Sequence, residues 1–179
     1  MSRLTPEVHA GDHIDGPARA PVTLVQYGDY ECPSCGAAYP IIKDLQQRFA
    51  GQMRFVFRNF PLAESHPHAE HAAEAAEAVA DLTRGKAFWA MHDTLYENQD
   101  ALEDEDLGAY AEDLDADGDA VERALDRGTY RERVRDDFKS GVRSGVNGTP
   151  TFFINGVRFD GDWSDVASFA SAIQSGATK

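Results

Sequence analysis

The chain has 179 residues, of which 42% are hydrophobic, enough for one domain with its own core or for one domain carrying a sizeable insertion. Its formal net charge of −14 at pH 7 repels nucleic acid and anionic membrane surfaces, so we expect neither as a partner. No stretch approaches the roughly 20 apolar residues of a membrane-spanning helix, and the first residues hold no apolar signal segment, which predicts a cytoplasmic protein without membrane insertion.

The chain opens with a polar stretch. Residues 1–20 are rich in Gly, Pro and Asp, which indicates a tail with at most one short strand near His13 and Ile14. Residues 21–27, which follow, are mostly β-branched, aromatic or otherwise apolar and predict a buried strand.

A helix and a second strand come after a break at residues 28–31. From Pro33 to about Phe49, apolar residues recur at spacings of three and four, which predicts a helix. Pro33 falls in the first turn of this helix, where proline is tolerated. Residues 53–60 alternate as a core strand does, so residues 21–60 are predicted to form a strand–helix–strand unit.

The middle of the chain changes character. Residues 66 to about 145 carry apolar side chains at helical spacing, which predicts a series of helices whose apolar stripes face a core. Strands return at residues 151–154 and 157–159. Between them lies Asn155-Gly156, a dipeptide typical of tight hairpin turns.

The order of the elements indicates an α/β fold. A last helix is predicted to begin after Ser164 as its N-cap. The elements therefore predict a mixed sheet with helices on both faces. We assign residues 1–65 to a tail and a βαβ half, residues 66–145 to a helical insertion, and residues 146–179 to a ββα half.

The only two cysteines of the sequence, Cys32 and Cys35, are three positions apart at the start of the first predicted helix. The first turn of a helix has unpaired N–H groups and a partial positive charge, and both stabilise a thiolate. We therefore expect a lowered pKa for Cys32 and a nucleophilic role toward disulfides. Cys35, one turn further along, is expected to resolve the mixed disulfide. The intervening Pro33 and Ser34 are expected to tune the redox properties of the pair.

Two cysteines at this spacing are also half of a zinc site, so a metal-binding or redox-sensing module is an alternative. A four-ligand Cys/His zinc site needs two more ligands, and His66, His68 and His71 have a spacing that could supply them. The same histidines are also expected at a partly exposed helix start, where His66 and Pro67 help to set the N-terminus, and this is the interpretation that we favour. We assign neither a metal nor another cofactor to the chain.

A second candidate site lies where the chain returns to strands, at residues 148–151. A proline directly before a strand and after Gly-Thr is a candidate for a cis peptide bond. A cis bond between Thr149 and Pro150 would turn the Thr149 backbone outward, where an extended substrate peptide could add to it as a strand. We therefore assign Thr149 and Pro150 to substrate binding. A trans proline that opens a strand is the alternative.

Several separated motifs, all in the same order, resemble those of the DsbA-like thioredoxin-fold disulfide oxidoreductases. They are residues 22–35, residues 58–62 with His66-Pro67, Phe88-Trp89, Asn98-Gln99, and residues 148–156. The resemblance covers the chain from about residue 10 to its end. It implies a thioredoxin fold with a helical insertion between its βαβ and ββα halves. It also implies a nucleophilic Cys32, a resolving Cys35 and a cis-Pro150 beside the disulfide.

The sequence departs from this family close to the cysteines. Related proteins commonly carry a carboxylate at the position of Gln26; because Gln26 cannot ionise, a water molecule or another group would have to take the proton of Cys35. The Pro-Ser dipeptide lacks the histidine of strongly oxidising members, and Asp29 and Glu31 oppose a thiolate at Cys32. We expect the pKa of Cys32 to lie between about 7, as in thioredoxin, and about 3.5, as in DsbA.

The sequence thus predicts an enzyme that exchanges disulfides with protein substrates and with an unidentified redox partner, cycling Cys32 and Cys35 between dithiol and disulfide. Glutathione-dependent transferases and isomerases share related folds but lack the second cysteine, so Cys35 argues against that class. No long heptad repeat stands out, and we expect a monomer.

Overall fold

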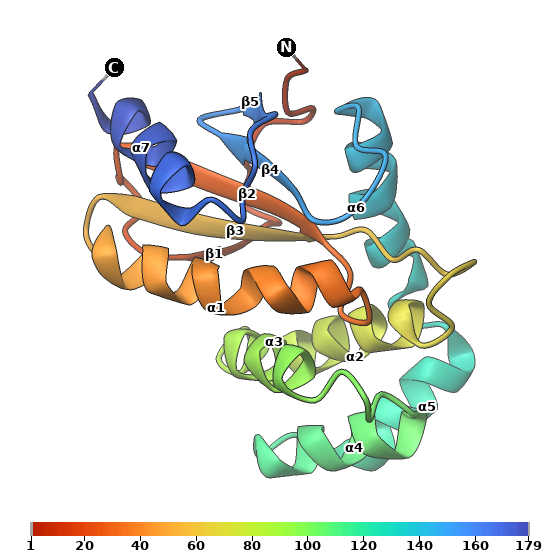
Figure 1. The fold of residues 1–179 in the computed structure, drawn as a ribbon. Helices are drawn as coiled ribbons and strands as arrows, with labels where there is room; N and C mark the ends of the chain where they lie inside the picture. Colours follow the sequence, from red (N-terminus) through yellow and green to blue (C-terminus); the bar gives the residue numbers. More distant parts are fainter. Residues whose placement is uncertain (1, 179) are drawn as a thin grey trace.

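A computed structural model describes residues 2–178, which form a five-stranded sheet and seven helices (Figure 1). The strands are β1 (His13–Asp15), β2 (Val22–Gly28), β3 (Met53–Asn59), β4 (Thr151–Ile154) and β5 (Val157–Phe159). The helices are α1 (Pro33–Arg48), α2 (Ala69–Leu82), α3 (Phe88–Glu97), α4 (Asp104–Asp113), α5 (Gly118–Arg127), α6 (Arg131–Arg143) and α7 (Val166–Ala177).

The sheet is mixed, with the strand order β1-β3-β2-β4-β5. The two strands of the βαβ unit, β2 and β3, are parallel, while β1 and β4 run antiparallel to their neighbours. The predicted hairpin joins β4 to β5, and Asn155 and Gly156 both have positive φ, as a tight two-residue turn requires. The predicted α/β class, a thioredoxin fold with a helical insertion, is confirmed.

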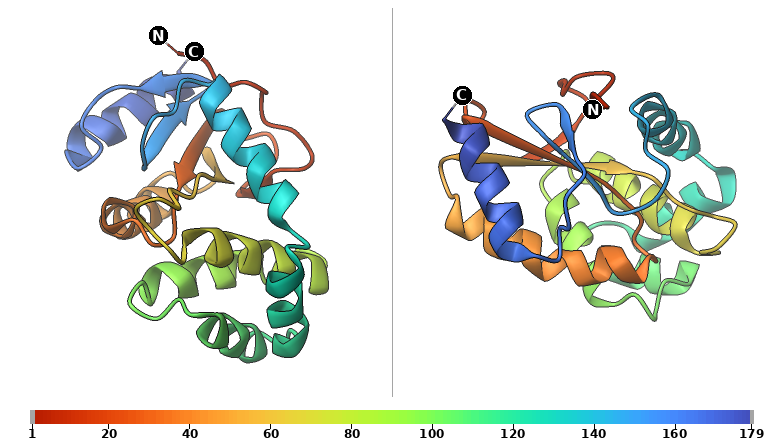
Figure 2. Two further views of the ribbon diagram at one scale, coloured as in Figure 1. Left: turned by 90° about the vertical axis from the view of Figure 1, so that its right-hand side faces the viewer. Right: turned by 45° about the horizontal axis from the view of Figure 1, so that its top comes forward.

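The sheet has two differently covered faces, because successive side chains of a strand point to opposite sides. The α1 face bears Leu24 and Gln26 of β2 and packs against α1, α3 and α7. The α6 face bears Val25 and Tyr27 and is covered by α6 and by residues 2–12. Figure 2 (left) shows α6 on one side of the sheet and α1 with α7 on the other.

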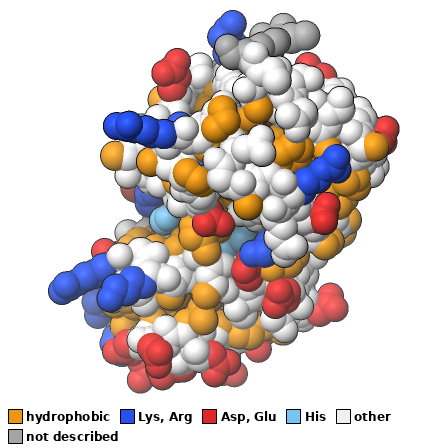
Figure 3. All heavy atoms as spheres, turned by 90° about the vertical axis from the view of Figure 1, so that its left-hand side faces the viewer, with side chains coloured by type: hydrophobic (Ala, Val, Ile, Leu, Met, Phe, Trp, Pro, Cys, Tyr) orange, Lys and Arg blue, Asp and Glu red, His pale blue; other side chains and the backbone are white. Residues whose placement is uncertain are grey.

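Helices α2 to α5 lie together below the sheet in Figure 1. The alanine-rich α2 is almost entirely buried and contacts α3, α4, α5 and α6. One hydrophobic cluster runs from β2 and α1 into this insertion. The first turn of α4 is acidic, and Figure 3 shows acidic side chains gathered at the lower end of the molecule, where α4 lies in Figure 1.

The first residues and the last helix differ from the prediction. The predicted tail packs on the α6 face: Leu4 is buried, Arg3 pairs with Val157 beside β5, and Asp12 forms a buried ion pair with Arg58. The N-cap of α7 is Asp165, whose side chain accepts a hydrogen bond from the backbone of Ser168, so the prediction of Ser164 was wrong by one residue. None of the helices within residues 2–178 combines the length and apolar character needed to cross a bilayer.

Candidate functional site: a dithiol at the start of helix α1

The site forms where β2 ends and α1 begins. Cys32 is the N-cap of α1, and Pro33 occupies the first turn, where its missing N–H has no partner to lose. Pro33 and Ser34 are exposed, whereas Cys32 and Cys35 are buried, and both cysteines are free thiols. The start of the helix therefore directs the two sulfur atoms inward beneath an exposed dipeptide.

The pKa of Cys32 is lowered to about 5. The largest cause is a hydrogen bond from the thiol of Cys35; burial opposes the shift, and Thr149 and the backbone N–H groups of Cys35 and Ser34 add to it. Ser34 thus acts through its backbone. The value lies between those expected from thioredoxin and DsbA, although Asp29 and Glu31 are close in sequence.

The pKa of Cys35 is shifted in the opposite direction. Its side chain is fully buried, and burial raises the pKa of its thiol, with the hydrogen bond to Cys32 and the charge of Cys32 adding to the effect. At neutral pH the pair therefore consists of one thiolate and one thiol that donates a hydrogen bond to it. Such an arrangement separates a nucleophile from a group that reacts only after it loses a proton.

The loop before β4 lies against the nucleophile. The Thr149–Pro150 peptide bond is cis, and the carbonyl oxygen of Thr149 lies 3.5 Å from the Sγ atom of Cys32. The Thr149 carbonyl thus lies beside the sulfur that a substrate would reach, and Pro150 is joined to Thr149 by the cis bond. Their assignment to substrate binding stays a prediction.

Gln99, two residues after the end of α3, is a site residue to which sequence reasoning gave no role. Its side-chain amide donates hydrogen bonds to the carbonyl oxygens of Tyr30 and Cys32, at 2.8 and 3.0 Å. Its oxygen also lies so close to Gly36 that a Cβ atom there would come within 2.0 Å. Gln99 therefore anchors the turn that leads into α1. The Asn98-Gln99 motif of the resemblance was the available signal.

The two acidic residues before Cys32 bind other groups. Asp29 is buried and accepts hydrogen bonds from the backbone N–H groups of Glu31 and Leu62, both at 2.8 Å, and pairs with Nδ1 of His66 at 2.8 Å. Although burial opposes it, this contact raises the pKa of His66. Glu31 accepts a hydrogen bond from the backbone of His68. Both carboxylates thus fix the loop after β3 beside the dithiol.

The three histidines considered as metal ligands face different partners. His66 binds the Asp29 carboxylate, His68 lies 3.6 Å from Glu103, and His71 lies 2.6 Å from Asp104. Within residues 2–178, no three His, Cys, Asp or Glu side chains are placed to hold one metal ion. Within these residues the three histidines and the two cysteines therefore do not form one set of metal ligands.

A family model described as Thioredoxin matches residues 9–175, which include both halves of the sheet, the insertion and the dithiol. The chain belongs to the thioredoxin family. The match extends over the helical insertion as well as the sheet, in agreement with the extent of the resemblance found from the motifs.

The curated relatives of this thioredoxin-family chain are longer proteins, and the chain matches only a part of each. It is 44% identical over 164 residues to Na⁺/H⁺ antiporter NhaA 1 of Salinispora arenicola, a match that covers 92% of this chain and 24% of the antiporter. The NhaA 1 antiporter of Mycolicibacterium vanbaalenii is 38% identical over 178 residues, covering 98% and 28%. The chain thus spans about a quarter of the length of these relatives.

Solved structures resemble nearly the whole chain. BdbD from Bacillus subtilis has a TM-score of 0.85 at 26% identity, with 94% of each chain covered. The catalytic domain of Proteus mirabilis ScsC (TM-score 0.79, 18% identity, 98% and 93% covered) and α-DsbA1 of Wolbachia pipientis (0.79, 17%, 96% and 93%) share the fold. The DsbA-like resemblance stated from the motifs is confirmed.

Proposed function

We propose that the chain is a thiol–disulfide oxidoreductase that exchanges disulfides with protein substrates through Cys32 and Cys35. The observation that carries the proposal is the difference in pKa between the two thiols. The thiol of Cys32, at the helix start, has a pKa of about 5, whereas the buried thiol of Cys35 has a raised pKa. The family match and the likeness to BdbD support the same activity.

The order of the two steps in disulfide exchange follows from this difference in pKa. The Cys32 thiolate attacks one sulfur of a substrate disulfide; an S–S bond forms, the substrate S–S bond breaks, and the electron pair leaves on the other substrate sulfur. Cys35 then loses its proton and attacks the Sγ atom of Cys32. The internal disulfide forms, and the fully reduced substrate is released. The reverse sequence oxidises a substrate dithiol, so the reduction potential decides the direction.

Protein substrates are favoured by the surroundings of the nucleophile. Pro33 and Ser34, which follow Cys32 in the chain, are exposed, and the carbonyl oxygen of Thr149 in the loop before β4 lies 3.5 Å from the Cys32 sulfur. A disulfide carried on an extended peptide could approach across this surface and pair with the backbone near Thr149.

The reduction potential of the pair tests the proposal. We expect one reversible disulfide in glutathione or dithiothreitol redox buffers, with a midpoint between about −270 mV, as in thioredoxin, and about −120 mV, as in DsbA. At a cytoplasmic poise of about −220 to −320 mV such a pair would be mostly reduced and act as a reductase; in an oxidising compartment it would act as an oxidant.

Two variants supply the control. Cys35→Ser should trap a mixed disulfide on Cys32, because the resolving thiol is missing, and Cys32→Ser should trap none. If the wild-type chain forms no reversible disulfide between its two cysteines, the oxidoreductase proposal is wrong.

A further inference from the structure

A buried carboxylate lies beside the dithiol. The side chain of Asp29 is 0% exposed, and its two oxygens accept hydrogen bonds from the backbone N–H groups of Glu31 and Leu62, both at 2.8 Å. The backbone carbonyl of Asp29 accepts a hydrogen bond from the N–H group of Cys32 at 3.2 Å, and its backbone also makes a hydrogen bond to the side chain of Cys35. A negative charge at this place opposes a thiolate at Cys32, because like charges repel more strongly away from water.

His66 is the side-chain partner of that carboxylate. Its Nδ1 atom lies 2.8 Å from Oδ2 of Asp29, and its side chain is 19% exposed, so water screens the pair only in part. An ionised carboxylate can only accept hydrogen bonds, so Nδ1 of His66 carries a proton and donates it to this contact. A buried carboxylate is stabilised by a paired cation, and the contact therefore favours the imidazolium form of the ring.

We propose that the imidazolium of His66 offsets the buried Asp29 carboxylate and thereby stabilises the dithiol state, with its Cys32 thiolate, over the disulfide state. The inference rests on the proposed function and adds to it a positioning residue, outside residues 32–35, that sets the reduction potential.

The charges around His66 differ in one respect between the two redox states. Burial opposes the imidazolium, but the contact with Asp29 raises the pKa of His66, and the charges of Cys32 and Glu31 add to this effect. The two carboxylates are the same in both states. The sulfur of Cys32, in contrast, is a thiolate in the dithiol and uncharged in the disulfide. His66 therefore faces one more negative charge when the pair is reduced.

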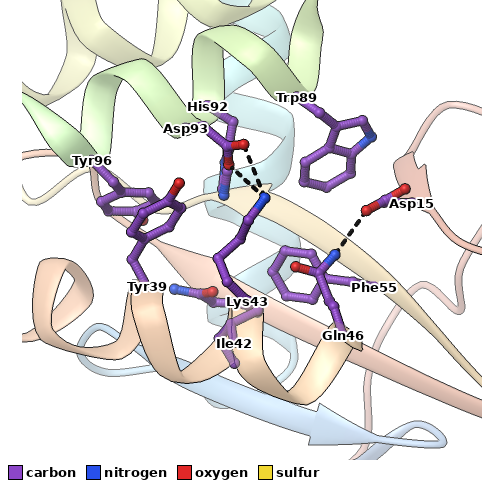
Figure 4. A pocket seen from close by; sticks show the side chains of 11 residues that line it. Asp15, Tyr39, Ile42, Lys43, Gln46, Phe55, Trp89, His92, Asp93 and Tyr96 are labelled. Atoms are coloured by element: carbon purple, nitrogen blue, oxygen red, sulfur yellow. Dashed lines mark hydrogen bonds and ion pairs between the residues drawn. The ribbon is translucent and has the colours of Figure 1, made fainter. Parts of the chain in front are cut away.

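Two other basic side chains near α1 do not supply the positive charge. His92 and Lys43 lie between α1 and α3 (Figure 4). Burial lowers the pKa of His92 to about 3, so this ring is neutral near pH 7. Lys43 forms an ion pair with Asp93, with Nζ 2.9 and 3.2 Å from the two carboxylate oxygens. A hollow beside the loop that carries His66 has charged lining residues that keep their charge in both redox states, namely Glu64, Glu70 and Arg135.

Thermodynamic linkage gives the signs of two effects. A cation close to the Cys32 thiolate favours the dithiol, so it makes the pair a stronger oxidant. The thiolate acts on the cation to the same extent, so the pKa of His66 must be higher in the dithiol than in the disulfide.

Reduction by glutathione balances with this extra proton. Two glutathione thiols give up two electrons and two protons and form glutathione disulfide, and the bond between Cys32 and Cys35 breaks. One proton binds to Cys35, whereas Cys32 stays a thiolate. His66 binds a part of the second proton, and the solvent takes the rest.

The equilibrium with glutathione at pH 6 and at pH 9 tests the inference. His66→Asn removes the charge but keeps a side-chain N–H group for Asp29. At pH 6, the ratio of dithiol to disulfide should fall about threefold to fivefold relative to the wild type, equivalent to about 14–21 mV. At pH 9, where an imidazole is largely neutral, the two proteins should agree within twofold.

Proton NMR of the imidazole rings measures the linkage directly in the disulfide and dithiol forms. The signal of His66 is the one that is lost in His66→Asn, and its pKa should be higher in the dithiol by about half a unit or more, which is less than the 1–3 units of a direct contact. His68→Asn is the matched control, because His68 belongs to the same segment but lies 3.6 Å from Glu103. Its equilibrium with glutathione should stay within twofold of the wild type at both pH values.

Equal pKa values of His66 in the two forms would overturn the inference. A difference between His66→Asn and the wild type that is the same at pH 6 and pH 9 would also overturn it, because a packing effect does not depend on the charge of the ring. If His66→Asn does not fold, heteronuclear assignment of the wild type supplies the same titration. Failure of the wild type to form a reversible disulfide would instead refute the oxidoreductase function.

Discussion

Gln26 and Tyr27 are neighbours on β2, yet their side chains meet opposite surroundings. On the α6 face, the hydroxyl of Tyr27 lies 2.7 Å from Oγ of Ser140 and accepts a hydrogen bond from Arg58 at 2.9 Å. Arg58 itself binds both carboxylate oxygens of Asp12, at 2.8 and 2.9 Å. On the α1 face, the amide nitrogen of Gln26 has no partner within the described residues.

The difference separates a polar network that the protein pairs internally from a buried amide that it leaves unpaired. Buried polar groups that serve stability are normally satisfied by the protein itself, as in the network around Arg58. A buried polar atom without a protein partner, such as Nε2 of Gln26, is open to a bound water molecule. The two faces should therefore respond differently to substitution, and the predictions that follow test this contrast.

The largest effect is expected from Arg58→Met on the α6 face. The Arg58 and Asp12 side chains are each 1% exposed, so the variant would leave a buried carboxylate without its cation. Breaking such a pair destabilises a protein by about 3–5 kcal/mol. Chemical denaturation should show a loss of this size, while the thiolate absorbance of Cys32 keeps its wild-type midpoint near pH 5.

Arg135→Met is the matched control on the same side of the molecule. Arg135 forms an exposed ion pair with Glu132 at 3.1 Å within α6, and its loss should cost less than about 1 kcal/mol. Similar losses in the Arg58→Met and Arg135→Met variants would contradict the view that the α6 face depends on a buried, fully paired network.

The second prediction concerns acidification of the α1 face. Burial, followed by the charges of Lys43 and His13, lowers the pKa of His92 to about 3, from an ordinary value near 6.5. Below pH 6.5 the unfolded chain binds a proton at this residue and the folded chain does not, so stability falls as the pH falls toward 3. The slope is about 1.4 kcal/mol per pH unit, or about 2 kcal/mol between pH 6.5 and pH 5.

His92→Gln should remove this contribution while keeping a polar partner for the hydroxyl of Tyr30. Unfolding free energies at pH 6.5 and pH 5 should therefore differ less in the variant than in the wild type, by about 2 kcal/mol. The stability contributed by the α6 face should not fall between pH 6.5 and pH 5. The pKa of Asp12 is lowered in the folded state, so the stability that it contributes is lost only below about pH 4, as the pH falls through that lowered pKa. If the free energy of unfolding depended on pH equally in the wild type and in His92→Gln, the assignment of this pH dependence to His92 would be wrong.

The contrast between the faces also explains what sequence reasoning could reach. The dithiol was predictable because its chemistry is local: Cys32, Pro33 and Cys35 fall within one turn at a helix start, and the preceding strand is apolar. Hydrophobic periodicity likewise predicted the order of strands and helices. The hairpin turn followed from Asn155 and Gly156, since few other residues adopt positive φ there.

Local sequence patterns could not predict contacts between segments that are far apart in the sequence. Arg58 and Asp12 are 46 residues apart in the sequence. The polar, Gly- and Pro-rich N-terminal segment was therefore predicted to be a tail, because nothing in its own sequence indicates that it covers a buried arginine. Gln26 and Tyr96 come from a strand and from the insertion, and only packing brings them to one cavity. Ser164 and Asp165 are both good N-caps, so neighbouring candidates could not be ranked from sequence.

The smallest effect on stability is expected from Gln26→Leu, and its size shows whether the buried amide of Gln26 is hydrated or unpaired. If the amide binds water, the variant exchanges those hydrogen bonds for apolar burial, and the free energy of unfolding should change by less than about 1 kcal/mol. If the amide is unpaired, its removal should stabilise the protein by about 1–3 kcal/mol. Tyr27→Phe, one residue along β2, should instead destabilise by about 1–3 kcal/mol, because it removes the hydroxyl shared by Ser140 and Arg58. Denaturation of the two variants side by side therefore compares the faces at adjacent positions, and a stabilised Gln26→Leu would show that the Gln26 amide is unpaired in the folded protein.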